Sequence, residues 1–170
     1  MAEAAIRPSE ARPEVVYRSV VSAEPGPGRL KILHLPVETA AVPMGLHGAV
    51  AAHYKAAEGT YTPHATTLDY VVAATAGCLL GTLIRALQVR KIDTDNGRLK
   101  TEGVGDVETE NGVLIIRRIR FVVHLQAQES QREAAERVMA VFASQCPVHQ
   151  SLHKAIDITT ELDFQTVPAS

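Results

Sequence analysis

The distribution of apolar and polar positions predicts β-strands in the N-terminal part of the chain. Two runs rich in β-branched and apolar residues, EVVYRSVV (14–21) and RLKILHL (29–35), lie on either side of EPGPG, which is a strong turn sequence. We therefore expect a first β-hairpin here. The segment GAVAAHYKA (48–56) is interpreted as a third strand.

A long apolar segment then predicts a buried helix of about twenty residues. It reads LDYVVAATAGCLLGTLIRAL (68–87), with Thr66 and Thr67 as candidate caps. Asp69 falls in the first turn, where a negative charge suits the helix dipole. The segment contains Asp69 and Arg85 and is rich in small residues, so a buried helix fits it better than a membrane span.

One face of this predicted helix carries almost no side chain. Ala73, Gly77 and Gly81 follow one another at a spacing of four, which places them on the same helical face. A glycine inside a helix costs about 1 kcal/mol relative to alanine, so close approach of another helix should offset that cost. The second helix can belong to the same chain, or it can be the same helix of a second subunit.

The C-terminal half predicts a long hairpin and a closing strand. Asn111-Gly112 joins GRLKTEGVGDVETE (97–110) to VLIIRRIRFVVHLQ (113–126), and this dipeptide between strand-like runs is a strong hairpin signal. The RRIR portion is typical of a solvated strand face rather than of a nucleic-acid patch. AIDITTELDF (155–164) alternates as a final strand. The element order predicts an α+β fold, with helices packed on one face of an antiparallel sheet.

A further helix is predicted between the hairpin and the final strand. Ser130 and Glu133 match a capping box, which marks a helix start. The apolar residues that follow share one helical face: Ala135, Val138, Met139 and Phe142.

Composition and charge narrow the class of protein. At 170 residues we expect a loose polar tail (1–13) and one domain (14–170). A formal net charge of −2 gives no sign of a nucleic-acid or membrane partner. The N-terminus lacks the apolar core of a signal peptide, and the chain has two cysteines, so we expect a cytoplasmic protein.

The two cysteines are the candidate reactive groups. Cys146 directly precedes Pro147 at the predicted start of a short helix, where free N–H groups and the helix dipole favour thiolate. The alternative is that Cys146 is a small buried apolar residue. Cys78 lies in the middle of the long helix and gains nothing from the dipole, and the only cation which that helix offers is Arg85, two turns away.

A metal site is a rival interpretation of the same residues. Cys146, His149 and His153 lie close in sequence, and with Cys78 they could form a Cys₂His₂ set. The sequence has neither a C-x-x-C pair nor an H-E-x-x-H motif, and it also lacks a glycine-rich phosphate loop and a G-x-S-x-G motif. We therefore expect no metal and no other cofactor.

Over residues 14–165 the chain resembles the OsmC/Ohr family, which comprises osmotically inducible protein C and organic hydroperoxide resistance proteins. The resemblance rests on TTLDYVVAATAGCLLGTL (66–83), the Asn-Gly hairpin, and CPVHQSLHKAIDITTEL (146–162). It implies an intertwined homodimer in which a large sheet wraps around central buried helices. Two thiol sites would then lie at the subunit interface.

The resemblance also implies a two-cysteine peroxidase that reduces organic hydroperoxides in an oxidative stress response. Cys78 maps onto the family's nucleophile and Cys146 onto its resolving cysteine, whereas local chemistry alone favours Cys146 as the more acidic thiol. Arg29, after the EPGPG turn, is the best match for the activating arginine, and Arg18 is the second. Where the family has a glutamate that holds this arginine the sequence reads TTLD, and Asp69, beside Leu68, is the nearest acidic residue.

The implied partners of this peroxidase are small molecules and a reductant. An organic hydroperoxide is the expected substrate, and an external dithiol, either lipoyl or thioredoxin-like, would reset the disulfide. Two alternatives stay open. One is a non-catalytic family member that binds a small apolar ligand in the dimer cleft, and the other is the Cys/His metal site.

Overall fold

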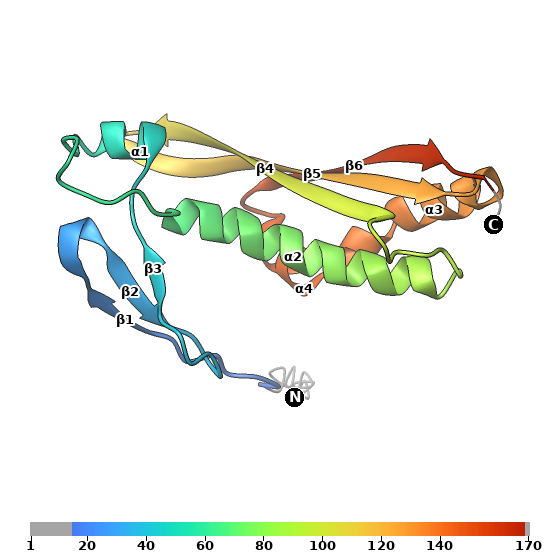
Figure 1. The fold of residues 1–170 in the computed structure, drawn as a ribbon, viewed down its shortest axis with the longest axis horizontal. Helices are drawn as coiled ribbons and strands as arrows, with labels where there is room; N and C mark the ends of the chain where they lie inside the picture. Colours follow the sequence, from blue (N-terminus) through green and yellow to red (C-terminus); the bar gives the residue numbers. More distant parts are fainter. Residues whose placement is uncertain (1–14, 169–170) are drawn as a thin grey trace, which may run out of the picture. The chain divides into compact units, whose positions relative to one another are not determined.

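The structure is a computed structural model that describes residues 15–168, and the tail expected at 1–13 lies outside these residues. The chain divides into two compact units, residues 1–64 and 65–170, which are described separately below. Both are drawn in Figure 1.

The N-terminal unit contains a small antiparallel sheet of three strands in the order β1-β2-β3. Its strands are β1 (Ser22–Pro25), β2 (Lys31–His34) and β3 (Val42–Met44), with the short 3-10 helix η1 (Pro27–Arg29) in the first turn. β1 pairs with β2, which confirms the predicted hairpin.

Two N-terminal predictions are wrong in detail. The first strand is displaced toward the turn, and residues 15–21 are exposed without regular structure. β-branched residues favour a strand only where a neighbouring strand gives them a surface to pack on. GAVAAHYKA forms the helix α1 (Gly48–His53) rather than a strand, consistent with the high helix propensity of its alanines. The third strand is β3, which lies earlier in the chain.

The C-terminal unit is built on a second sheet of three strands, β4 (Leu99–Glu110), β5 (Val113–Ala127) and β6 (Asp157–Thr166). β4 and β5 form the predicted antiparallel hairpin. Asn111 and Gly112 at its tip have φ values of 50° and 80°, the left-handed pair that a type I′ turn requires.

The expectation of a purely antiparallel sheet is corrected at β6. This strand pairs with β5 in parallel, so the second sheet is mixed. Parallel neighbours require a crossover connection, because the chain must return to the same end of the sheet. Residues 128–156 supply it, through four short helices: η2 (Glu129–Gln131), α3 (Arg132–Met139), η3 (Phe142–Gln145) and α4 (Pro147–Leu152).

The long helix α2 (Thr67–Gln88) confirms the predicted segment, with 22 residues. Thr66 is its N-cap, and the Asp69 carboxylate accepts from the Thr66 N–H at 2.6 Å and from its hydroxyl at 2.7 Å. The Thr66 hydroxyl oxygen in turn accepts from the Asp69 N–H, which completes a capping box.

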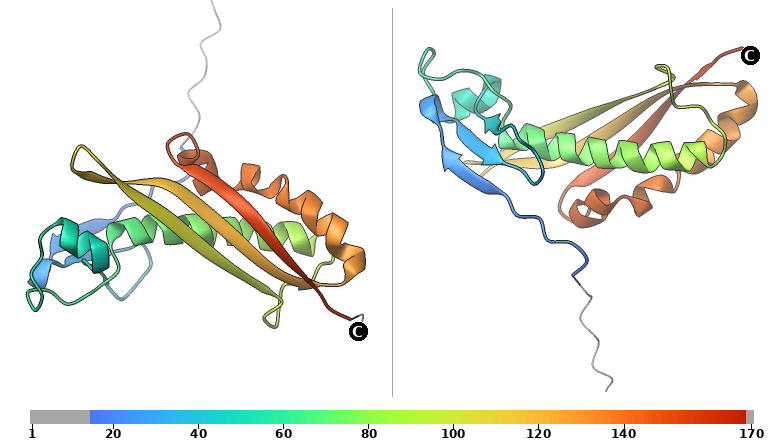
Figure 2. Two further views of the ribbon diagram at one scale, coloured as in Figure 1. Left: turned by 90° about the horizontal axis from the view of Figure 1, so that it is seen from above. Right: turned by 60° about the horizontal axis from the view of Figure 1, so that its bottom comes forward.

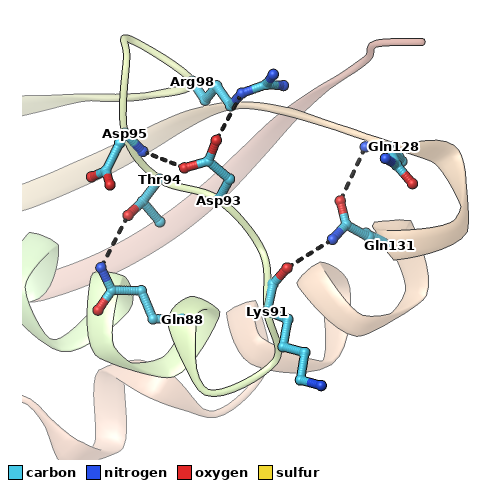
Figure 3. Close-up of polar contacts among 8 residues, drawn as sticks. All are labelled: Gln88, Lys91, Asp93, Thr94, Asp95, Arg98, Gln128 and Gln131. Carbon is cyan, nitrogen blue, oxygen red and sulfur yellow. Dashed lines mark hydrogen bonds and ion pairs between the residues drawn. The ribbon is translucent and has the colours of Figure 1, made fainter. Parts of the chain in front are cut away.

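The capping box predicted at Ser130 and Glu133 for the start of α3 is wrong. The α3 N-cap is Gln131, without a side-chain capping bond, because Ser130 is taken into η2. The Gln131 side-chain oxygen accepts from the Gln128 N–H, and its amide group donates to the Lys91 carbonyl oxygen at 3.1 Å (Figure 3). The start of α3 is therefore tied to the loop that follows α2.

The core of this unit lies between the sheet and the helices, which cover one of its faces (Figure 2). Alternate β5 residues point toward the helices and are buried: Ile119, Phe121, Val123, Leu125 and Ala127. The opposing helix residues are Leu79, Leu83 and Leu87 of α2, with Ala135, Val138 and Phe142 from the crossover. On the other face Arg118 pairs with Asp106 and Glu108, which confirms RRIR as part of a solvated strand face.

Helix α2 lies close to the backbone of β4 at two glycines, Gly103 and Gly105. A Cβ atom placed on Gly103 would lie 2.9 Å from the Ala76 Cβ atom, and one on Gly105 would lie 2.5 Å from a Val72 methyl group. Real Cβ atoms do not approach one another this closely, so both glycines are required by the position of α2.

We predict that Gly103→Ala destabilises the protein by about 1–3 kcal/mol, because the added methyl group meets a Cβ atom that cannot move unless the helix moves. In an ordinary strand alanine would be favoured over glycine, so a loss of stability reports the close approach. The free energy of unfolding in urea is the measurement. Glu102→Ala, an exposed neighbour on the same strand, should change it by less than about 0.5 kcal/mol. Equal stability of Gly103→Ala and the parent protein would contradict the packing described here.

Candidate functional site

Cys146 is held at the start of α4, as predicted from the sequence. It is the N-cap of that helix, and its Sγ atom accepts a hydrogen bond from the His149 N–H at 3.5 Å. Pro147 occupies the first helical turn, where a missing N–H costs nothing. The Cys146 side chain is completely buried within the core.

Burial, rather than the helix terminus, dominates the acidity of Cys146. Desolvation raises the pKa of this thiol, and the N–H groups of His149 and Val148 oppose the shift without cancelling it. Of the two interpretations that the sequence left open, burial of Cys146 as a small apolar residue is the one that the structure favours. The sequence places the thiol at a helix start, but burial depends on the core that β5 and α2 build around it.

Cys78 lies next to Cys146 although the two are distant in sequence. Its side chain is half-buried and packs against the core cluster that contains Cys146. The side chain and charge of Cys78 act on Cys146 and further raise the pKa of the Cys146 thiol. Both cysteines are free thiols in this structure. Two free thiols that pack in the same cluster are candidates for a dithiol–disulfide pair.

A groove of about 830 Å³ runs along α2 and exposes Cys78. Its walls come from α2 and the chain after it on one side, and from the end of the crossover on the other. The lining residues are Gly77, Cys78, Gly81, Thr82, Arg85, Ala86, Val89, Arg90, Val141, Phe142, Gln145 and Pro147. Cys78 is therefore reachable from outside through the groove, whereas Cys146 lies behind it.

The face of α2 that carries Ala73, Gly77 and Gly81 is exposed. A Cβ atom placed on Gly77 or Gly81 would have no neighbour within 4 Å among the described residues, so no helix of the described chain crosses here. By length and composition α2 could cross a membrane. Its most apolar window has a mean hydropathy of 1.7 and is 22% buried, so the burial predicted for this helix is not seen within the described chain.

The other two candidate catalytic residues are Asp69 and Arg29. Asp69 lies nine residues before Cys78 on α2, and Arg29 belongs to the N-terminal unit. Asp69 is in the first turn of α2 and binds Thr66. Arg29 belongs to the N-terminal unit, where its Nη1 atom donates to the Tyr54 carbonyl oxygen at 3.4 Å and its backbone is left-handed, with φ of 65°.

The histidines of the alternative metal set interact with each other. The rings of His149 and His153 stack with centroids 5.2 Å apart and an interplanar angle of 4°. Burial and the nearby His153 lower the pKa of His149, which favours its neutral form. Within residues 15–168 no group of three or more His, Cys, Asp or Glu side chains is arranged to hold a metal ion. The structure thus gives the metal interpretation no donor set.

Comparison with known proteins places the chain in a family. Residues 59–161 match the family model described as OsmC-like protein, which is more than half of the chain. The chain therefore belongs to the OsmC-like protein family, as its resemblance to the OsmC/Ohr proteins indicated. A comparison with curated protein sequences gives no significant match.

Solved structures with the same fold include organic hydroperoxide resistance proteins. The crystal structure of OhrB of Bacillus subtilis matches with a TM-score of 0.62 and 18% identity, over 88% of this chain and 100% of that one. The crystal structure of an OsmC-like protein from Mycoplasma pneumoniae matches with a TM-score of 0.63 and 13% identity, over 91% of this chain and 100% of that one. The crystal structure of an organic hydroperoxide resistance protein OsmC from Legionella pneumophila matches with a TM-score of 0.60 and 12% identity, over 91% of this chain and 100% of that one. At these identities the likeness confirms the α+β fold.

We predict that the two thiols differ strongly in reactivity. In Cys78→Ser the remaining thiol is buried and its pKa is raised, so alkylation by iodoacetamide near neutral pH should be at least about tenfold slower than in Cys146→Ser. Because the thiolate is the reactive form, the rate for Cys146 should continue to rise at pH values above about 8.5, where an ordinary thiol levels off. Intact-mass spectrometry follows both variants.

The same measurement in urea is the control for this prediction. Both variants should react at similar rates when unfolded, because the environments that separate the thiols are then gone. A faster reaction of Cys146 in the folded protein would restore the assignment of Cys146 as the acidic thiol.

Proposed function

We propose that this protein is a homodimeric thiol peroxidase that reduces organic hydroperoxides through a two-cysteine cycle. The observation that carries the proposal is the contact between Cys78, which lines an open groove, and Cys146, which is buried behind it. Membership of the OsmC-like family supports it, as do structural neighbours named as organic hydroperoxide resistance proteins.

In the first step the Cys78 thiolate attacks the distal oxygen of ROOH. A sulfur–oxygen bond forms and the oxygen–oxygen bond breaks, so the sulfur is oxidised to a sulfenic acid. The peroxide is reduced to the alcohol ROH after the leaving alkoxide takes up a proton. Arg29 is the proposed cation that favours the thiolate, and Asp69 is the nearest acidic residue to the position of the family's glutamate.

In the second step the Cys146 thiol condenses with the sulfenic acid. A sulfur–sulfur bond forms and water leaves, which protects Cys78 from further oxidation. Because burial raises the pKa of Cys146, its thiol stays largely protonated and reacts slowly with peroxide. This suits a thiol that reacts only with an adjacent sulfenic acid. An external dithiol, of the lipoyl or thioredoxin type, then exchanges with the disulfide and leaves both cysteines reduced. A cytoplasmic location would keep such reductants available.

We predict that Cys78→Ser abolishes turnover of tert-butyl hydroperoxide with a dithiol reductant. Cys146→Ser should consume one equivalent of peroxide and then stall, because the sulfenic acid has no resolving thiol. Consumption of peroxide and trapping of the sulfenic acid with dimedone, read by mass spectrometry, are the measurements.

Two other outcomes would change this assignment. If the two variants exchange behaviours, Cys146 is the nucleophile. If the wild-type protein binds hydroperoxide in the groove without turning it over, the peroxidase proposal fails, and the chain is a non-catalytic member that binds a small apolar ligand.

The homodimer is proposed to form across the open face of α2. Ala73, Gly77 and Gly81 leave that face without side chains, and in the described chain nothing covers the two glycines. Small residues allow two helix backbones to approach closely, which offsets the propensity cost of glycine inside a helix. The same helix of a second copy is the proposed cover, and Gly77 and Gly81 also border the groove, so the partner would close one of its sides.

We predict that Gly81→Leu weakens association by at least about tenfold, because a large side chain overpacks a close helix contact. The mass of the species in sedimentation equilibrium, measured over a dilution series, is the readout. Val141→Ala, at an exposed position on the far wall of the groove, is the matched control and should leave the mass unchanged. A monomeric parent protein, or a Gly81→Leu dimer as stable as the parent, would overturn the proposed interface.

A further inference from the structure

His149 carries a buried ring nitrogen that has no role in the cycle proposed above. Among residues 15–168 its Nδ1 atom has no hydrogen-bond partner. Most buried polar groups in folded proteins are paired, so an unpaired one calls for an explanation. The residue follows Cys146 by three positions, which makes the resolving thiol the first group to consider.

The start of α4 brings this side chain to the same side of the helix as the thiol. Cys146 is the N-cap, and His149 is the third helical residue. A side chain at this position characteristically reaches back toward the N-cap. The His149 N–H donates to the Cys146 Sγ atom at 3.5 Å, so the sulfur and the imidazole lie beside the same backbone N–H group.

The surroundings of the His149 ring keep it neutral. Burial lowers the pKa of His149, and the nearby His153 lowers it further. The two rings are stacked, and the His153 Nδ1 atom lies 3.0 Å from the His149 carbonyl oxygen, to which it donates. A buried N–H without an acceptor is tolerated less well than a buried lone pair, so we assign the proton of the His149 ring to Nε2. Its Nδ1 atom then carries a free lone pair.

The other titratable groups around α4 are poorer proton acceptors. α4 packs against η3, which has no titratable side chain, and against α2, which has Asp69, Tyr70, Cys78 and Arg85. The Asp69 carboxylate is occupied in the helix cap, a phenol is not a base near neutral pH, and a guanidinium has no lone pair to offer. Cys78 is the group that the resolving thiol attacks. Among these groups His149 alone combines a neutral ring with a free lone pair.

We propose that His149 is the general base that takes the proton of Cys146 when the disulfide forms, an inference that rests on the two-cysteine cycle proposed above. The Cys146 S–H bond breaks, and its proton passes to the His149 Nδ1 atom. The Cys146 sulfur attacks the Cys78 sulfur, whose bond to oxygen breaks, and the leaving hydroxide takes the proton from His149 to become water. Cys146 is oxidised, the sulfenic sulfur of Cys78 is reduced, and the imidazole returns to its neutral form.

A buried resolving thiol needs such a base. The thiolate is the nucleophile in disulfide formation, and burial raises the pKa of Cys146, so little thiolate forms unaided near neutral pH. A neutral imidazole is suited to accept this proton at the pH of the cell. Hydrogen bonds used in catalysis are often long in the resting protein and tighten in the reacting complex. An unpaired Nδ1 atom in the reduced protein fits a role that begins only after Cys78 has been oxidised.

The test uses a probe that contains no peroxide, so that resolution is measured separately from turnover. One equivalent of 4,4′-dithiodipyridine converts the accessible Cys78 to a mixed disulfide and releases 4-thiopyridone. Cys146 then displaces a second 4-thiopyridone and closes the internal disulfide. The two steps appear as successive phases of absorbance, and intact-mass spectrometry identifies the mixed and the internal disulfide.

We predict that His149→Gln slows the second phase at least about tenfold near pH 7 and leaves the first phase unchanged. In the parent protein the second phase should change little between about pH 8 and pH 6.5, because the lowered pKa of His149 keeps its ring neutral there, and it should slow at lower pH. In the variant its rate should follow the Cys146 thiolate and rise about tenfold per pH unit, so that the two proteins converge in alkaline solution.

Two further variants separate chemistry from structure. His124→Gln, which removes an imidazole that contacts Asp163 on the solvated face of the sheet, is the matched control and should leave both phases unchanged. His149→Ser keeps the backbone N–H that binds Cys146 but has no base, and it should behave as His149→Gln does. Circular dichroism confirms that each variant is folded. A second phase slowed equally at every pH would show a merely structural role of His149 and overturn the proposal.

Two other results would also overturn it. A second phase in His149→Gln as fast as that of the parent protein near pH 7 would remove His149 from the cycle and leave the cycle itself in place. A parent protein that stops at the mixed disulfide would remove the thiol pair, and the peroxidase cycle with it. A second phase that depends on His149, in a protein that turns over no hydroperoxide, would leave this inference intact and remove only the proposed function.

Discussion

The packing of α2 against β4 is the constraint on which the rest of the C-terminal unit depends. Gly103 and Gly105 allow the helix to lie directly on the strand backbone, with Val72 and Ala76 seated where strand side chains would otherwise stand. Leu79, Leu83 and Leu87 continue the same buried face along the sheet. These contacts fix the rotation of α2 about its own axis, and the rotation sets the direction of its other side chains. Cys78 is therefore directed to the flank where α4 begins, and the small residues are left facing outward.

Two features of the Cys146 environment shift the pKa of its thiol in opposite directions. A helix start favours the thiolate of Cys146, and the bonds from the N–H groups of His149 and Val148 are present as expected. Complete burial has the larger effect, and it raises the pKa of that thiol. Cys78 lacks a helix terminus but faces a groove, so access rather than a dipole distinguishes it. In the proposed cycle this difference in access assigns attack on the peroxide to Cys78 and formation of the disulfide to Cys146.

The sequence was sufficient for elements whose signals are local. The Asn111-Gly112 turn, the Thr66 cap of α2 and the Pro147 start of α4 each depend on a few neighbouring residues, and each was predicted correctly. Features set by distant parts of the chain were not predictable in this way. The parallel pairing of β6 with β5 follows from a crossover, and the burial of Cys146 follows from the core around it. GAVAAHYKA was ambiguous because a short apolar run fits either a strand or a helix. For the site, sequence identified both cysteines and noticed Arg85, but the groove that joins Arg85 and Arg90 to Cys78 exists only in three dimensions.

The parallel placement of β6 has a consequence for the biogenesis of the thiol pair. Cys146 belongs to a connection whose C-terminal end is fixed only when the last strand of the chain has docked beside β5. Contacts between segments so distant in sequence form late, because the intervening chain must first be ordered. On the ribosome, Cys78 emerges long before its neighbour can be positioned, and during that interval it is an unshielded thiol on an apolar helix. The Cys78 thiol of the nascent chain is consequently most vulnerable to oxidation and to mispaired disulfides before the C-terminal segment has been made.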